Sequence, residues 1–294
     1  FTNTEILSIL CNNPHVSFLY AFEPRFPLKR EDMAASVCSM SASRRGAHQR
    51  VVSFSFYGSV HNKRYFKGIE GNARILSDYY KGWYMRIYHN LPKKTPEYRL
   101  LKNTVRNCLN VDLCEVDNLP YLGNLSDLFG MMWRISPLYD PLVDVVVFRD
   151  LDRRFLHREV QAVNEWLSLN ETFHMMRDHP NHRVPILGGL WGVKLSHQRD
   201  LLKALLLELF SYCRKLPCRP GRVSNDQHAL KQIVWPVAKE DSVQHDSYSC
   251  FKYNNTRPFP SQRMTEENSK YILSPLVWCP VTCRPKNHQN WVYC

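Results

Sequence analysis

Two aspartates separated by one residue, Asp150 and Asp152, follow the most apolar β-branched run of the sequence, Val143–Phe148. A run of this kind predicts a central strand that is buried on both faces, with the two carboxylates at its carboxyl end. Carboxylate oxygens suit a hard divalent cation, which in turn neutralises a diphosphate. The pair therefore predicts a metal site, although Asp-x-Asp also occurs in loops that bind no metal.

Arginines flank these aspartates at positions 149, 153 and 154. A planar guanidinium group can contact phosphate oxygens, and it can equally form a salt bridge that positions an aspartate. Both interpretations stay open for each of the three arginines.

A second segment combines histidines with a glycine pair. His174, His179 and His182 are unevenly spaced, which favours hydrogen bonding to a ligand or closure of a turn over direct metal ligation. Gly188 and Gly189 end an apolar run and would let a ligand approach the backbone closely. The alternative for the glycine pair is a tight bend or a bulge.

Two polar residues stand apart from these segments. Asp226 lies at the start of a predicted helix, where the helix dipole favours a carboxylate. A carboxylate held there could act as a general base toward an acceptor hydroxyl. His245 lies after Pro236, where it is a candidate metal ligand or an ordinary loop histidine.

Alternating strands and helices must position these residues. The β-rich runs predict strands, and the helical periodicity predicts helices between them. The expected strands are 51–57, 83–88, 111–116, 143–148, 172–176 and 184–190, and the expected helices are 69–80, 97–109, 126–133, 156–169, 196–213 and 225–234. Such alternation implies parallel pairing in a Rossmann-like α/β sheet, which binds ligands outside the carboxyl ends of its strands. We expect an irregular lead-in over 1–50 and an irregular chain after Pro236.

Bulk properties narrow the classes of protein further. The 294 residues can form one large domain. The net charge of +12 attracts polyanions, but without a run of five or more basic residues we expect no dedicated nucleic-acid arm. There is no apolar run of about 18 residues that could span a membrane. The sequence starts at Phe1, so we expect a processed or truncated chain that a membrane anchor could precede.

The cysteines indicate an oxidising compartment. None of the ten forms Cys-x-x-Cys, which argues against zinc ribbons and thioredoxin-like sites. Their clustering near the C-terminus predicts a tail pinned by disulfides, and such pairing needs an oxidising environment. Three Asn-x-Ser/Thr acceptors, at Asn124, Asn170 and Asn254, fit the same compartment.

A series of short motifs follows a recognisable order between residues 51 and 263. The motifs include Arg149-Asp150-Leu151-Asp152-Arg153, Met176-Arg177-Asp178-His179-Pro180, Gly188-Gly189-Leu190-Trp191-Gly192, Asp226-Gln227 and His245-Asp246-Ser247-Tyr248, with Asn72 and the Met132-Trp133-Arg134 step earlier in the chain. In this order they resemble a group of glycosyltransferases with a GT-A-type fold. The chain departs from that group at Arg153-Arg154, where the group pattern has Asp-Ser-Arg.

The resemblance implies a GT-A-like catalytic domain over 51–263, with a nucleotide-binding half at about 51–155 and an acceptor half at about 156–263. The clustered cysteines mark the remaining residues, 264–294, as a Cys-rich tail. The resemblance also implies metal-dependent transfer of a sugar from a nucleotide sugar to a glycan, glycoprotein or glycolipid in the Golgi lumen or outside the cell. The implied residues are Asp150, Asp152 and His245 for a divalent metal such as Mn²⁺; Arg149, Arg154, Asn72, Arg134, Gly188 and Gly189 for the nucleotide sugar; and Asp226 or Asp178 as the base of an inverting reaction.

Two other classes of function remain as alternatives. A non-catalytic ectodomain could bind a glycan or a nucleotide sugar without transferring it. A metal-dependent phosphohydrolase or nuclease would also use paired aspartates, but it would need more clustered carboxylates than the sequence offers.

Overall fold

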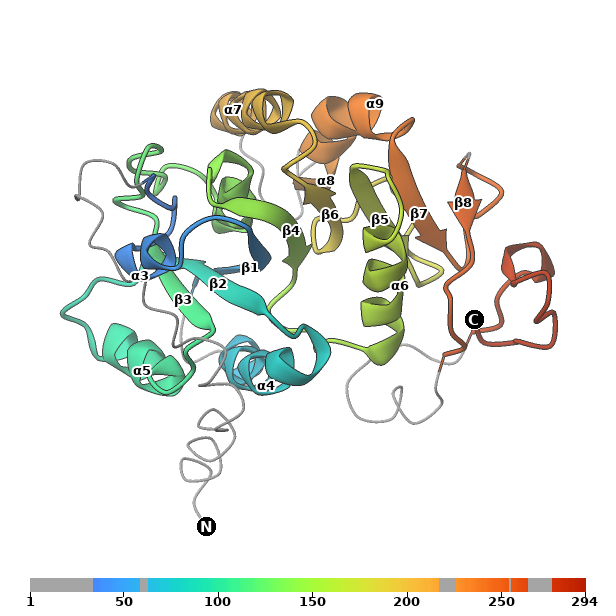
Figure 1. Cartoon of the computed structure of the whole chain (residues 1–294), viewed down its shortest axis with the longest axis horizontal. Coiled ribbons are helices and arrows are strands. Elements are labelled where there is room, and N and C mark those ends of the chain that lie inside the picture. Colours follow the sequence, from blue (N-terminus) through green and yellow to red (C-terminus); the bar gives the residue numbers. More distant parts are fainter. Residues whose placement is uncertain (1–33, 59–62, 217–225, 254, 264–276) are drawn as a thin grey trace, which may run out of the picture.

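An eight-stranded sheet forms the centre of the molecule (Figure 1). The computed structural model describes residues 34–58, 63–216, 226–253, 255–263 and 277–294. Across the sheet the strands are β3 (Val111–Glu115), β2 (Trp83–His89), β1 (Gln49–Phe56), β4 (Val143–Arg149), β6 (Leu190–Lys194), β5 (Phe173–Arg177), β7 (Ser242–Asp246) and β8 (Thr256–Arg257). Neighbouring strands are parallel except at β6, which pairs antiparallel with both β4 and β5.

Helices cover both faces of this sheet. The first face carries α4 (Lys63–Tyr79), α5 (Pro96–Val105) and α6 (His157–Leu167). The second face carries the 3₁₀ helix η1 (Gly130–Tyr139), α7 (Arg199–Lys215), α8 (Asp226–Ala229), the π-helical turn η2 (Leu230–Val234) and α9 (Trp235–Ala238). Two short elements complete the described structure, α3 (Met40–Arg44), whose Ala42 joins the core cluster of the second face, and η3 (Val281–Cys283) in the C-terminal segment. Among the described helices, none is both long and apolar enough to cross a membrane.

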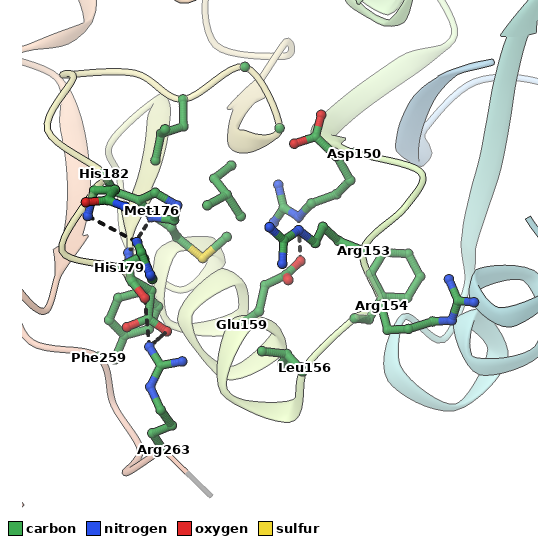
Figure 2. Close-up of a pocket in the computed structure, with 18 of the residues that line it drawn as sticks. Asp150, Arg153, Arg154, Leu156, Glu159, Met176, His179, His182, Phe259 and Arg263 are labelled. Atoms are coloured by element: carbon green, nitrogen blue, oxygen red, sulfur yellow. Dashed lines mark hydrogen bonds and ion pairs between the residues drawn. The ribbon is translucent and has the colours of Figure 1, made fainter. Parts of the chain in front are cut away.

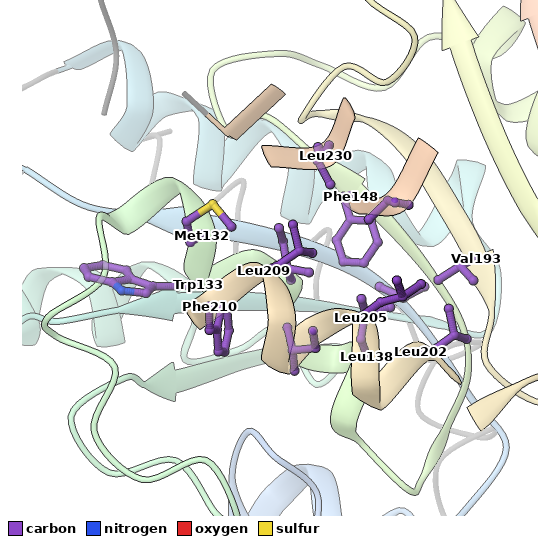
Figure 3. Close-up of a cluster of buried hydrophobic side chains, with 14 of the residues drawn as sticks. Met132, Trp133, Leu138, Phe148, Val193, Leu202, Leu205, Leu209, Phe210 and Leu230 are labelled. Carbon is purple, nitrogen blue, oxygen red and sulfur yellow. The ribbon is translucent and has the colours of Figure 1, made fainter. Parts of the chain in front are cut away.

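Alternate side chains along β4 point to opposite faces of the sheet and pack into the two core clusters. Val145 and Val147 point to the cluster under α4 and α6, whereas Val146 and Phe148 point to the cluster under α7. Helix α7 supplies Leu202, Leu205, Leu206, Leu209 and Phe210 at helical spacing, and Figure 3 shows several of them gathered around Phe148. Because both faces of β4 are buried, the strand is apolar almost throughout.

The sheet confirms the predicted fold class, an α/β fold whose mostly parallel central sheet is flanked by helices. Three predicted elements differ. Residues 184–190 were expected as a strand, but this segment is a loop that leads into β6, where Pro185 lacks an amide hydrogen and two glycines follow. The expected helix at 126–133 is replaced by a turn and η1. Strand β7 lies in the segment that was expected to be irregular.

Disulfides fasten both ends of the described chain to the sheet. Cys38–Cys114 joins the lead-in to β3, while Cys250–Cys283 and Cys279–Cys294 hold the C-terminal segment. The predicted disulfide-pinned tail is thereby confirmed. Among the described cysteines none is free. In the lead-in, the described residues contain α3 and the first two residues of β1.

We expect the Cys38–Cys114 cross-link to be a large contributor to stability. It joins cysteines 76 positions apart, so replacing both with alanine should lower the free energy of unfolding by about 4 kcal/mol, because the unfolded chain regains the entropy of that loop. Denaturant unfolding of the double variant measures the change. An unchanged unfolding midpoint would contradict the expectation.

Candidate active site

A cavity of about 420 Å³ opens where β4 and β5 end (Figure 2). Its walls come from the turn after β4, the start of α6, the loop between β5 and β6, and the segment that follows β8. Figure 2 shows Asp150 and Arg153 on one side and His179, His182 and Arg263 on the other. The cavity lies at the carboxyl ends of parallel strands, where ligands of open α/β sheets bind.

The turn after β4 carries two of the three predicted metal ligands and brings one of them directly to this cavity. The side chain of Asp150 is 51% exposed and lines the cavity. The amide of Arg153 donates to the carbonyl oxygen of Asp150 at 3.1 Å, which closes the turn. Asp152 is half-buried in the same turn and is not one of the described residues that line the cavity.

Helix α4 holds this turn in place. The side-chain amide of Asn72 donates to the carbonyl of Arg153 at 2.8 Å, and the guanidinium of Arg154 donates to the carbonyl of Lys67 at 2.5 Å. A Cβ at Gly68 would lie 1.8 Å from a carbonyl oxygen of the turn, so the helix and the turn are in direct backbone contact. Arg154 lines the cavity with part of its side chain but points toward α4 (Figure 2). Asn72 and Arg154, both predicted to bind the nucleotide, therefore position the aspartate turn.

Arg134 connects two of the predicted site residues. Its guanidinium is 7% exposed and donates to Asp150 at 2.5 Å and to Asp226 at 2.8 Å. The backbone of Arg134 is held by β1, because its amide donates to the hydroxyl of Ser55 and its carbonyl accepts from Ser53. The cavity-facing aspartate and the start of α8 are thus joined through one buried cation.

The glycine pair lets these carboxylates pack against the loop before β6. A Cβ at Gly188 would lie 2.0 Å from a carboxylate oxygen of Asp226, and a Cβ at Gly189 would lie 2.3 Å from one of Asp150. Both glycines also line the cavity. The sequence predicted a close approach to the backbone here, and within the chain the groups that approach are these two aspartates.

The two candidate bases lie in opposite electrostatic environments. Burial raises the pKa of Asp226, and the attraction of Arg134 only partly offsets this effect. For Asp178, burial acts in the same direction, but Arg158 and Arg263 outweigh it and lower the pKa. Asp178 accepts from Arg158 at 3.1 Å and from the Ser247 hydroxyl at 2.7 Å, and it pairs with Arg263 at 2.7 Å. Asp226 is therefore the more basic carboxylate of the two.

His245 lies in a different environment from the aspartates. It is fully buried in β7, where one ring nitrogen lies 2.9 Å from His174 and the other lies 3.1 Å from Glu165. Burial lowers the pKa of His245, and a hydrogen bond from it holds the pKa of Glu165 at about 2. Within the described ranges, no three His, Cys, Asp or Glu side chains lie together as a metal site, so the structure does not gather Asp150, Asp152 and His245.

Other cavity residues were only partly visible in the sequence. The guanidinium of Arg149 bonds to Glu159 and to the carbonyl of Phe148, so the carboxylate it positions is a glutamate of α6 and not, as the salt-bridge interpretation had it, an aspartate of the turn. Glu159, Phe259 and Arg263 line the cavity but were not predicted as site residues. Phe259 and Arg263 belong to the irregular segment after β8, where no periodicity points toward the sheet.

The comparisons with known proteins give structural neighbours only. No family model and no curated protein matches the sequence. The chain is similar to the mannosyltransferase PcManGT from Pyrobaculum calidifontis in complex with GDP-Man and Mn²⁺, with 12% identity and a TM-score of 0.40 over 86% of this chain and 67% of that one. It is also similar to the mannosyltransferase Ktr4p from S. cerevisiae, with 10% identity and a TM-score of 0.36 over 99% and 90% of the two chains. At these values the function has to be argued from the site itself.

The bridge made by Arg134 predicts a coupled stability change. Replacing Arg134 with methionine should cost about 3–5 kcal/mol, because Asp226 is left buried without its cation. Adding Asp226→Leu to Arg134→Met should recover part of that loss. Denaturant unfolding of both single variants and the double variant measures the coupling, and purely additive losses would contradict the bridge.

Proposed function

We propose that this chain is a metal-dependent glycosyltransferase that binds its nucleotide-sugar donor in the cavity at the ends of β4 and β5. The observation that carries the proposal is the position of Asp150, a half-exposed carboxylate that enters the cavity from the carboxyl end of the buried strand β4. Asp152 stands two positions later on the same turn, which α4 holds from behind. The two carboxylates are therefore held in fixed positions, as binding of a charged donor requires.

The donor set of the turn suits a hard divalent cation such as Mn²⁺. Asp150 and Asp152 supply two carboxylates, and such an ion commonly takes its other ligands from substrate phosphates and water. When bound, it would supply positive charge to the leaving diphosphate. We leave His245 out of this set because both of its ring nitrogens are engaged in the core. Arg153 is exposed at the same cavity and can contact a phosphate oxygen.

The remaining predicted residues act on the shape of the donor site. Gly188 and Gly189 keep the loop backbone close to the cavity, where a side chain would displace the aspartates. Arg149 and Arg134 hold neighbouring carboxylates rather than face the donor with a free guanidinium. In this proposal they are positioning residues.

The transfer step needs a proton acceptor if the configuration inverts. The acceptor hydroxyl oxygen attacks the anomeric carbon, the bond from that carbon to the diphosphate oxygen breaks, and the hydroxyl proton goes to a base. We assign the base role to Asp226 rather than Asp178, because a raised pKa makes a carboxylate a better base. Asp226 packs against Gly188, and the next residue, Gln227, lines the cavity.

We place the protein in the secretory pathway, as a Golgi lumenal or secreted domain. The three disulfides between described residues support an oxidising compartment. Asn124 and Asn170 are exposed acceptors of the glycosylation pattern, and Asn254 lies outside the described residues.

Donor binding can be tested by thermal unfolding against a panel of nucleoside diphosphates and sugar nucleotides, with Mn²⁺ or with a chelator. One nucleotide should raise the melting temperature by about 5 °C at a concentration of roughly 100 times its Kd, and only with the metal, because it binds the folded state alone. Asp152→Ala should remove this shift and abolish transfer. The matched control is Asp127→Ala, which removes an exposed aspartate that pairs with Arg214 away from the cavity.

Two results would contradict the donor assignment. A folded Asp152→Ala protein with full transfer activity would refute the metal role of this turn. The absence of a shift with every nucleotide would favour the alternative of a non-catalytic binding domain.

The base assignment predicts separate effects for the two aspartates. Asp226→Asn should lower transfer by about 10²–10⁴-fold while the nucleotide-dependent rise in melting temperature is kept. In the unaltered enzyme, transfer should fall as the pH drops through the raised pKa of Asp226, because the base becomes protonated. Asp178→Asn should instead reduce stability, since Arg158 and Arg263 lose their carboxylate. Equal transfer rates in Asp226→Asn and the parent enzyme would refute the assignment.

A further inference from the structure

A second cavity, of about 760 Å³, lies on the other side of Phe259 from the donor site. Its walls come from the end of α6, the residues just before β5 and β7, the β8 segment, and the C-terminal turn from Pro285 to Trp291. Figure 1 shows the C-terminal segment, coloured red, next to β8. Phe259 lines both cavities, so the two are neighbours. The volume falls in the range of ligand pockets, about 300–1,000 Å³.

The wall formed by the C-terminal turn is aromatic. The rings of His288 and Trp291 stack with their centroids 4.3 Å apart and their planes 10° apart, and both residues line the cavity. Such a pair offers a flat, rigid apolar surface with polar edges. The face of a pyranose ring, which carries only C–H groups, has the matching shape and polarity.

The opposite wall offers hydrogen-bond acceptors. Glu165, Glu171 and Glu240 line the cavity. Glu165 is fixed in place, because His245 lies 3.1 Å from one of its carboxylate oxygens and Arg257 lies 2.7 Å from the other. Carboxylates held in this way accept hydrogen bonds from hydroxyl groups more strongly than neutral acceptors do.

The lining of this cavity carries a net negative charge, opposite in sign to the net charge of the whole chain. Three carboxylates line it against two basic side chains, Arg257 and Lys286, whereas the chain carries a net charge of +12. A sulfated or otherwise polyanionic ligand would be repelled here while the basic surface elsewhere attracts it. The local charge therefore favours a neutral ligand that is rich in hydroxyl groups.

Cross-links keep the aromatic wall in its place before any ligand binds. The Cys279–Cys294 disulfide closes the base of the turn, and Cys250–Cys283 ties it to the segment after β7. Arg284 spans the turn by donating to the carbonyl of Cys279 at 3.0 Å and to that of Gln289 at 2.8 Å. A site that is already ordered loses less entropy when it binds.

From these observations we infer that the second cavity is a binding site for a neutral oligosaccharide, with the His288–Trp291 stack as its sugar platform and Glu165 and Glu171 as hydroxyl acceptors. That this oligosaccharide is part of the acceptor glycan rests on the proposed function. A long acceptor would then be held at two neighbouring places, the donor cavity and this one.

The test uses the whole chain and a panel of neutral probes, mannotriose, chitotriose and cellotriose, with a heparin hexasaccharide as the anionic probe. Binding is measured by calorimetry or by ligand-observed NMR. At least one neutral probe should bind, and Trp291→Ala should weaken it by tenfold or more. The matched control is Trp278→Ala, which removes another tryptophan of the same tail that is 71% exposed and does not line the cavity.

Glu171→Gln provides a second variant with little change in shape, and it should weaken the same probe severalfold. The inference is overturned if no neutral probe binds, if Trp291→Ala and Trp278→Ala bind equally well, or if the heparin probe binds this cavity in preference to all neutral probes. The nucleotide-dependent rise in melting temperature separates the two proposals. Nucleotide binding without oligosaccharide binding refutes only this inference, and oligosaccharide binding without a nucleotide effect refutes only the donor assignment.

Discussion

The buried guanidinium of Arg134 makes the interaction on which the geometry of the cavity at the ends of β4 and β5 depends. It pairs with Asp150 and Asp226 at once, and these residues lie 76 positions apart in the sequence. Desolvating one cation is costly, and the cost is offset only if both carboxylates stay within hydrogen-bond distance. The end of β4, the start of α8 and the strand β1 that holds the Arg134 backbone are therefore bound to one another. The glycine pair completes the arrangement because any side chain there would separate the charges.

The apolar half of the fold was predictable because its elements follow simple periodicities. Val143–Phe148 and the leucines of α7 bury apolar side chains at strand and helix spacing, and the structure contains both elements. Strand β7 was missed because its buried residues are Ser242, Val243, Gln244, His245 and Asp246. Their polar groups are satisfied across the sheet, for example by Arg177, which donates to Asp246 and Gln244. When the buried side chains of a strand are polar and hydrogen-bonded, the sequence contains no hydrophobic pattern from which the strand could be predicted.

The candidate site was predictable to the extent that its residues follow strands or open helices. Asp150 and Asp226 were singled out for such positions and Asp178 by its place in the motif order, and all three lie at or against the cavity at the ends of β4 and β5. The role of Asn72 in holding the turn depends on packing between α4 and residues more than 75 positions away, which no local pattern reports. His245 was a plausible ligand by its place in the motif order, but only the three-dimensional pairing with His174 and Glu165 reveals that its ring is occupied.

The cross-links of the C-terminal segment have a consequence for how the protein matures. The first cavity lies at the strand ends of the packed sheet, whereas the aromatic wall of the second cavity stands on a turn with little regular structure of its own. That wall is held in place by the Cys250–Cys283 and Cys279–Cys294 disulfides. Closing these two disulfides is therefore a requirement of the second cavity in addition to the packing of the sheet. The supply of oxidising equivalents during synthesis would set what fraction of the molecules possess both.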